Sequence, residues 1–261
     1  MSGLTLHVRE ATGADELVVL EPSRPPVATV VTLASRLTTD LQGRAPVWEE
    51  LPAADVAAVA LTIRQAWLGE RISTDARCPR PGCFARMDIA FDIPAYLAYY
   101  RPQPYAGLEP APDAGWFELA GAAQDPTPAR VPVSFRLPTV ADLLAALAAA
   151  DPERCLRERC VRPPDVSAAV ARQVSDAMAA LAPSLTGEVT AQCPACGGRD
   201  QLRFDPVSYA LTELRDAAAD LYEEVHLLAS AFGWTEDAIL ALPRRRRVRY
   251  AELIRRDRSA V

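Results

Sequence analysis

Four cysteines stand in two short pairs whose spacing suits a metal ion. Cys193 and Cys196 lie in the sequence Cys-Pro-Ala-Cys-Gly, and Cys78 and Cys83 lie in a similar sequence with two more residues between the thiols. Proline and glycine beside the cysteines give the tight turn of a zinc knuckle, which aims two sulfurs at one ion. Because a structural zinc site takes about four ligands, we predict one structural Zn²⁺ per chain, held by all four cysteines. The alternative, which the longer first knuckle favours, is that the knuckles are relics with free or oxidised thiols.

The remaining cysteines, Cys155 and Cys160, are five positions apart. That spacing is poor for placing two ligands on one face of a helix. Cys160 lies beside Val161 and is expected to be a small buried hydrophobic residue. The sequence therefore favours burial over metal binding for these two thiols and leaves open whether either has a metal or redox role.

The two knuckles lie in matching surroundings. Phe91 and Phe204 each follow the second cysteine of their knuckle by eight residues, and Tyr96 and Tyr209 follow it by thirteen. Apolar residues at helical spacing precede each knuckle, and alternating residues follow the first one. The sequence therefore predicts an α+β, mainly α-helical fold with two pseudo-repeated helix–strand–zinc knuckle–strand–helix units and a long C-terminal helix.

The apolar periodicity also places individual elements. We expect helices at 52–67, 138–150 and 166–181 and strands at 86–91 and 131–137. The expected organisation is an N-terminal helical segment (1–50), a first knuckle unit (51–100), a Pro/Gly-rich connector (101–130), a second knuckle unit (131–206) and a C-terminal segment (207–261).

Composition limits the class of protein. Half of the 261 residues are apolar, so the chain can bury a core without metal, and its net charge of -6 argues against a surface built for nucleic acid. The longest apolar run, 143–150, is far shorter than the roughly 20 residues that cross a bilayer, and the first ten residues carry no apolar signal, so we expect a cytoplasmic protein without membrane contact. Phosphate loops, nucleophile elbows and metalloprotease motifs are missing, so we expect neither enzymatic activity nor a small-molecule substrate.

The C-terminal segment combines an apolar seam with a basic end. Apolar residues step by three and four through 207–232, which predicts one long helix that ends at Gly233. This seam either binds a partner helix or packs on the protein's own core. Eight arginines follow in 244–258, where they either attract an acidic partner or form a solvated helix.

A partner with an apolar groove rimmed by acids would match both features of this segment. The candidate partner-binding residues are Leu214, Leu221, Leu228, Trp234, Arg244, Arg245, Arg246 and Arg247. Because the basic end lies beyond both knuckles and the seam, removing the residues after Leu242 is expected to leave the fold intact.

Several short motifs and their order resemble a known family. They are Arg136-Leu137-Pro138-Thr139, Arg159-Cys160-Val161, Cys193-Pro194-Ala195-Cys196-Gly197, Phe204-Asp205 and Gly233-Trp234-Thr235-Glu236. From about Leu51 onward the chain looks like the T-even-like baseplate hub assembly chaperones, which contractile-tailed phages and phage-tail-derived injection systems encode. The resemblance implies a non-enzymatic assembly factor or minor structural component of a baseplate. Its partners would be tail proteins, and it would be found in the cytoplasm or in the assembled particle.

A second hypothesis is a zinc-ribbon protein that binds nucleic acid or regulates another process. Such a module needs basic and aromatic residues around its knuckles. The knuckles here have few arginines, and Asp88 and Asp200 lie among them. The sequence therefore ranks nucleic-acid binding below the baseplate hypothesis.

Overall fold

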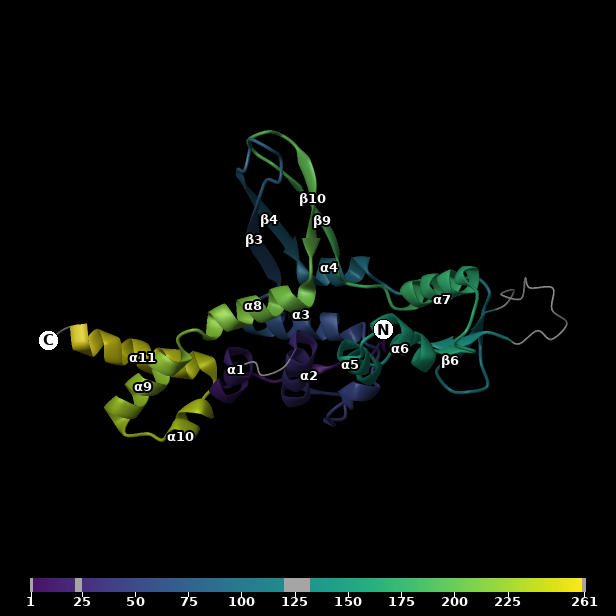
Figure 1. Cartoon of the computed structure of the whole chain (residues 1–261). Coiled ribbons are helices and arrows are strands. Elements are labelled where there is room, and N and C mark those ends of the chain that lie inside the picture. Colours follow the sequence, from purple (N-terminus) through teal and green to yellow (C-terminus); the bar gives the residue numbers. More distant parts are fainter. Residues whose placement is uncertain (1, 22–24, 120–131, 260–261) are drawn as a thin grey trace.

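The computed structural model describes residues 2–21, 25–119 and 132–259, and it has the expected α+β, mainly α-helical fold (Figure 1). The α-helices are α1 (Gly13–Leu20), α2 (Pro26–Leu37), α3 (Asp55–Leu68), α4 (Ile93–Tyr99), α5 (Val140–Ala148), α6 (Pro152–Cys160), α7 (Ala168–Leu181), α8 (Pro206–Ala218), α9 (Leu221–Phe232), α10 (Glu236–Leu240) and α11 (Arg244–Ser259). A short 3-10 helix, η1 (Trp48–Glu50), precedes α3. Residues 120–131, which include part of the expected connector and the start of the expected strand at 131–137, lie outside the described residues.

Two long hairpins form an arm above the helices. Strand β3 (Arg71–Arg77) pairs with β4 (Arg86–Asp92), and β9 (Gly187–Gln192) pairs with β10 (Arg199–Phe204), both antiparallel. The hairpins lie against each other through β4 and β9 and rise together from α3, α4 and α8 (Figure 1). The expected repeat is confirmed, because α3 and α4 flank the first hairpin and α7 and α8 flank the second.

The matching aromatic residues of the two units meet at the base of the arm. The ring centroids of Phe91 and Phe204 are 5.2 Å apart in an edge-to-face arrangement. Tyr96 lies 5.2 Å from Phe91, and its counterpart Tyr209 lies 5.2 Å from Phe204. Edge-to-face aromatic pairs add about 0.5–1.5 kcal/mol to the free energy gained from burial, so this cluster joins the two units.

A second repeat precedes the helix that leads into each hairpin, and the apolar periodicity did not reveal it. Strand β1 (His7–Val8) pairs with β2 (Thr38–Thr39), and β7 (Ser134–Arg136) pairs with β8 (Val161–Arg162). Two helices connect the strands of each pair, α1 and α2 in the first case and α5 and α6 in the second. Strand β7 also belongs to a four-stranded sheet with β5 (Leu108–Pro110), β6 (Trp116–Leu119) and β8. The described chain therefore contains two copies of one strand–helix–helix–strand–helix–hairpin–helix unit.

Each copy has the same buried charge cluster at the start of its first helix. Thr12 and Asp15 form a capping box in α1, and Thr139 and Asp142 form one in α5. Both carboxylates are at most 1% exposed. Each carboxylate accepts hydrogen bonds from two arginines, one located three residues before the threonine and one at the end of the next helix. For Asp15 these are Arg9 and Arg36. For Asp142 they are Arg136 and Arg159.

These bonds stabilise the ionised carboxylate of Asp142. Burial would raise its pKa, but hydrogen bonds from the Arg136 guanidinium, the Thr139 N–H and the Arg159 guanidinium outweigh burial and lower the pKa well below its usual range. A carboxyl group whose pKa is lowered in the folded state stabilises that state above its unfolded pKa of about 3.9, and the contribution is lost as the pH falls through the folded pKa.

The Asp142→Asn variant is therefore expected to lose about 2–3 kcal/mol of unfolding free energy at pH 7, the scale of hydrogen bonds to a charged group. The deficit relative to wild type should shrink as the pH falls below about 4, because the unfolded wild-type chain then takes up a proton on Asp142 that the folded state, with its lowered pKa, does not bind. Urea unfolding at a series of pH values measures both effects, with Asp176→Asn on the exposed side of α7 as the matched control. Equal unfolding midpoints for Asp142→Asn and wild type at pH 7 would contradict this role.

The expected helix at 207–232 is wrong in one respect, because two helices stand in its place. Helix α8 ends at Ala218 and α9 begins at Leu221, with the Ala219 N–H bonded to the Asp216 carbonyl between them. The apolar face of α8 packs on α1, α2 and α3, while α9 packs on α10 and α11. The seam therefore packs on the protein's own core, in two separate hydrophobic clusters.

In both copies of the unit, a Leu-Pro segment from another part of the chain contacts the start of the first helix. The Gly13 N–H donates to the Leu242 carbonyl, and the Val140 N–H donates to the Leu51 carbonyl. Thr12 lies opposite Pro243, as Thr139 lies opposite Pro52. Through the first of these contacts the C-terminal helices are joined to the N-terminal one.

Candidate metal centre

The thiols of Cys78, Cys83, Cys193 and Cys196 meet at the far end of the arm. All four sulfurs lie within 4.8 Å of one another, and among the described residues they form a group that could hold a metal ion. The Sγ atoms of Cys78 and Cys196 are 3.8 Å apart, and those of Cys83 and Cys193 are 3.7 Å apart. A tetrahedral site with metal–sulfur bonds of about 2.3 Å places its sulfurs about 3.8 Å apart, whereas a disulfide needs about 2.0 Å. The geometry therefore fits a metal ion and excludes disulfides between these pairs.

The backbone of the two turns explains why the sulfurs converge. The Cys78 N–H donates to the Ala85 carbonyl at 2.9 Å, and the Cys193 N–H donates to the Gly198 carbonyl at 2.8 Å. Each acceptor stands two residues after the second cysteine, so both hairpins close in the same way. The residue between has a positive φ in both turns, which glycine adopts freely at Gly197 and which Phe84 adopts at 49°.

The longer turn of the first knuckle contributes to the contact between the knuckles. It contains Arg80, whose Nε lies 3.3 Å from Oδ2 of Asp200 and whose Nη2 donates to the Arg199 carbonyl. The guanidinium lies directly over Gly198, where an added Cβ would stand 2.1 Å from Cζ of Arg80. The longer turn thus brings a cation across to β10 and still leaves both thiols in the cluster.

Crowding of the thiols perturbs their acidity. Hydrogen bonds from the backbone N–H groups of Cys196 and Ala195 lower the pKa of Cys193 to about 7. The Arg80 N–H favours the thiolate of Cys78, but burial and the three neighbouring thiols outweigh it and raise the pKa of Cys78 to about 12. Several thiolates at this separation repel one another, so full ionisation of the group needs a cation at its centre.

The cluster has the character of a structural site. Cys78 and Cys193 are buried, whereas Cys196 is exposed at the surface. A metal bound by all four thiolates has its coordination filled, so no position remains for a substrate or an activated water. Its effect would be to hold the tips of the two hairpins together.

The structure places Cys155 and Cys160 away from this group. Cys160 is 1% exposed, and its thiol donates to Oδ2 of Asp142 at 3.7 Å. Cys160 is the last residue of α6, and the last residue of the matching helix α2 in the first copy is Leu37, which is also 1% exposed. Cys160 therefore serves as a small buried residue, as its neighbours in the sequence suggested.

The candidate partner-binding residues are divided between the core and the surface. Leu214, Leu221 and Leu228 are at most 1% exposed, so the packing of the chain itself covers them. Trp234 is half-buried and lies 5.0 Å from Phe232 and 5.4 Å from Tyr250 between ring centroids. The three leucines are therefore not part of the accessible surface, while Trp234 lies at its edge.

The four arginines at the start of α11 also differ from one another. Arg245 and Arg246 are exposed, Arg244 is half-buried, and Arg247 is only 1% exposed. The Nε of Arg247 lies 2.6 Å from Glu224 and its Nη2 lies 2.5 Å from Glu16, so one guanidinium joins α1, α9 and α11. A run of arginines gives no sign in the sequence that one of them is buried.

This burial corrects the expectation that removing the residues after Leu242 leaves the fold intact. The deletion would remove Arg247 and leave two carboxylates without their cation. It would also uncover the cluster in which Ala251 and Ile254 pack against Leu228 and Ile239. Point substitutions at exposed arginines are therefore the proper test of the basic end.

Comparisons of the chain with protein-family models, with curated proteins and with solved structures gave no match. Within the described parts of the chain, no helix has both the length and the apolar character that a bilayer crossing requires.

Proposed function

We propose that the four cysteines hold one structural Zn²⁺ and that the chain is a non-enzymatic assembly factor or minor structural component of a contractile, phage-tail-like baseplate. The single observation that carries the metal assignment is the cluster of four sulfurs with tetrahedral spacing. The order of motifs that resembles the baseplate hub assembly chaperones supports the biological setting. The protein would act in the cytoplasm or within the assembled particle, with tail proteins as partners.

An exposed patch on the C-terminal helices supports a protein partner. Phe232 is 47% exposed beside Trp234 and Tyr250, and the guanidinium of Arg246 lies 5.7 Å from the centroid of the Tyr250 ring. Arg245 and Arg258 add positive charge on the same helix. Aromatic and arginine side chains are the types that dominate binding at protein interfaces, and the charge suits an acidic surface.

The alternative, a zinc-ribbon protein that binds nucleic acid, has less support. In the arm Arg86 pairs with Asp75 at 3.2 Å and with Asp88 at 3.6 Å. Arg80 pairs with Asp200 across the two knuckles. Arginines that already contact carboxylates are less available to phosphates, so the arm lacks the open basic face of a nucleic-acid module.

The test is affinity purification of the tagged chain from its native host at low and moderate salt. We expect structural proteins of a contractile particle to co-purify, and the double variant Arg245→Glu/Arg246→Glu to reduce their yield about tenfold or more, because charge reversal repels an acidic partner. Arg172→Glu on the exposed face of α7 is the matched control. Recovery of nucleic acid instead of tail proteins, lost in the same double variant, would replace this proposal with the alternative.

A further inference from the structure

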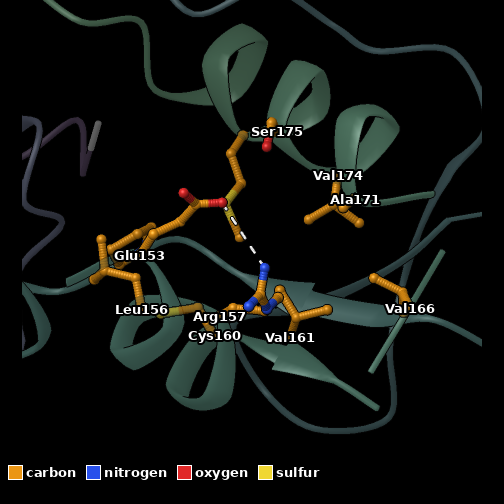
Figure 2. Close-up of a pocket in the computed structure, with 11 residues that line it drawn as sticks. Glu153, Leu156, Arg157, Cys160, Val161, Val166, Ala171, Val174 and Ser175 are labelled. Carbon is orange, nitrogen blue, oxygen red and sulfur yellow. Dashed lines mark ion pairs between the residues drawn. The ribbon is translucent and has the colours of Figure 1, made fainter. Parts of the chain in front are cut away.

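Two apolar surfaces of the described chain have opposite shapes. One is a crevice of about 210 Å³ that side chains of α6 and α7 line, among them Leu156 and Val174 (Figure 2). Val174 belongs to the cluster that α7 forms with the four-stranded sheet, so the wall of this crevice is part of the chain's own core. The other surface projects outward in the turn at the end of the arm, where Phe84 is 60% exposed.

Phe84 holds a backbone conformation that bulky residues rarely adopt. Its φ of 49° lies in the left-handed region, in which the Cβ atom of an L-residue crowds the following carbonyl oxygen. The matching residue of the second knuckle is Gly197, with a φ of 69°, and a Cβ added there would meet no atom within 4 Å. Glycine therefore stands in the second knuckle for its backbone freedom and not for lack of space. The first knuckle has a strained phenylalanine in place of this relaxed residue.

Burial within the chain does not offset this strain. The hydrophobic clusters of the described residues do not include Phe84, although one of them lies in the arm beside it. An aromatic ring contributes to stability when it leaves water, and most of Phe84 stays in water. Strained residues of this kind are concentrated at sites that contact another molecule. The position and exposure of Phe84 therefore indicate a role in binding rather than in folding.

A second position beside the first knuckle differs between the copies in the same sense. Arg77 lies opposite Arg86 in the hairpin, and like charges directly opposite each other are destabilising. The matching pair in the second hairpin is Gln192 and Arg199, which carries a single charge. Arg86 contacts two aspartates of its own hairpin, whereas Arg77 is exposed and has no ion pair among the described residues. The end of the arm thus combines an exposed ring with an unpaired cation.

Prolines make this end of the arm rigid. Pro79, Pro81 and Pro194 are exposed in the two turns, and the four thiols meet between those turns. Proline fixes its own φ, and the proposed metal would hold the two turns together. A rigid surface loses little conformational entropy when it binds. The end of the arm is therefore preorganised to insert into a pocket of another protein.

We propose that Phe84 is the anchor of a docking surface at the end of the arm, and that it inserts into an apolar pocket of a partner protein with a carboxylate at the border. The pocket would bury the ring that the chain leaves in water, and the carboxylate would pair with Arg77. This inference rests on the proposed function for the identity of the partner as a tail protein. It adds a contact on a part of the molecule separate from the C-terminal helices (Figure 1).

The first test uses the double variant Arg77→Gln/Phe84→Gly, which gives the first knuckle the residues of the second. Its metal content should equal that of wild-type protein. Its unfolding equilibrium constant should be unchanged or up to about fivefold smaller, because the left-handed strain is removed. A constant more than about tenfold larger, or a loss of metal relative to wild type, would show that these residues serve the hairpin itself and would overturn the inference.

The second test places the photo-crosslinking analogue p-benzoyl-phenylalanine at position 84 of the full-length chain in its native host. We expect a crosslink to a tail protein, at a site where mass spectrometry identifies both apolar and acidic residues. The double variant should reduce the recovery of that protein with the tagged chain by about tenfold. Tyr99 is the matched control, because this aromatic residue of α4 is 82% exposed at the base of the arm. The analogue at position 99 should give no such crosslink, and Tyr99→Ala should leave the recovery unchanged.

The outcomes separate this surface from the proposed function. Absence of a crosslink at position 84, or a crosslink to a second copy of this chain, would overturn the partner pocket. A crosslink to an apolar, acid-bordered pocket on a protein unrelated to contractile particles would support the docking surface and reject the baseplate setting. Tail proteins that co-purify equally with wild type and with the double variant would reject the docking surface alone.

Discussion

Replacing Cys193 with serine should release the metal from the protein and separate the tips of the two hairpins. Serine is a poor ligand for a metal that prefers thiolates, and three cysteines no longer close a tetrahedral site. Wild-type protein purified without chelator is expected to contain about one zinc per chain, and the variant close to none. The unfolding free energy should fall by roughly 4 kcal/mol or more, as is usual when a structural metal is lost. Elemental analysis and thermal unfolding measure the two effects.

The control for this prediction is Cys155→Ser, which removes a thiol outside the cluster. It should retain both metal and stability, and chelation of wild-type protein should reproduce the Cys193→Ser transition temperature. A zinc content near zero in wild-type protein would reject a shared metal site. A content near two would require a second site elsewhere in the chain.

Replacing Arg247 with alanine should destabilise the protein as strongly as any single change outside the arm. The substitution leaves the buried carboxylates of Glu16 and Glu224 without their cation, and breaking a buried ion pair in this way costs about 3–5 kcal/mol. Burial already raises the pKa of Glu224 even though the Arg247 guanidinium opposes the shift. Chemical denaturation at pH 7 measures the loss.

Two further variants isolate the cause. Arg256→Ala, at an exposed position of the same helix, should change the unfolding free energy by no more than about 0.5 kcal/mol. The triple variant Arg247→Met/Glu16→Gln/Glu224→Gln should recover much of the loss, because no uncompensated charge remains buried. If Arg247→Ala is as stable as wild type, the guanidinium does not join α1, α9 and α11 in solution.

The sequence predicted the cluster of four cysteines well because thiol spacing and turn chemistry are local properties. The Cys-Pro-Ala-Cys-Gly turn and the equal distances to Phe91 and Phe204 were sufficient to pair the two hairpins. The benefit of the longer first turn was not predictable, since it depends on Arg80 reaching Asp200 far away in the sequence. That contact exists only after the hairpins lie side by side.

The C-terminal helices show where periodicity fails. Apolar residues continue at steps of three and four across Ala219 and Asp220, so the pattern cannot distinguish one long helix from two that bury the same side. The charged repeat was missed for the opposite reason. Its signal is a polar motif, Arg-x-x-Thr-x-x-Asp at residues 9–15 and 136–142, and a search for apolar patterns does not detect it.

The positions of the four clustered cysteines along the chain have a consequence for how the proposed metal site would form in the cell. A ribosome makes the N-terminal knuckle first, and the two thiols that complete the site are added 115 residues later. At about 5–20 residues per second, the first pair therefore waits several seconds or more with half of its ligands missing. Coordination of the proposed metal by all four thiols would become possible only when the second hairpin has emerged, so the site would form only after both hairpins have been made. A chain truncated between the knuckles would lack this closure and expose the inner face of its hairpin to chaperones and proteases.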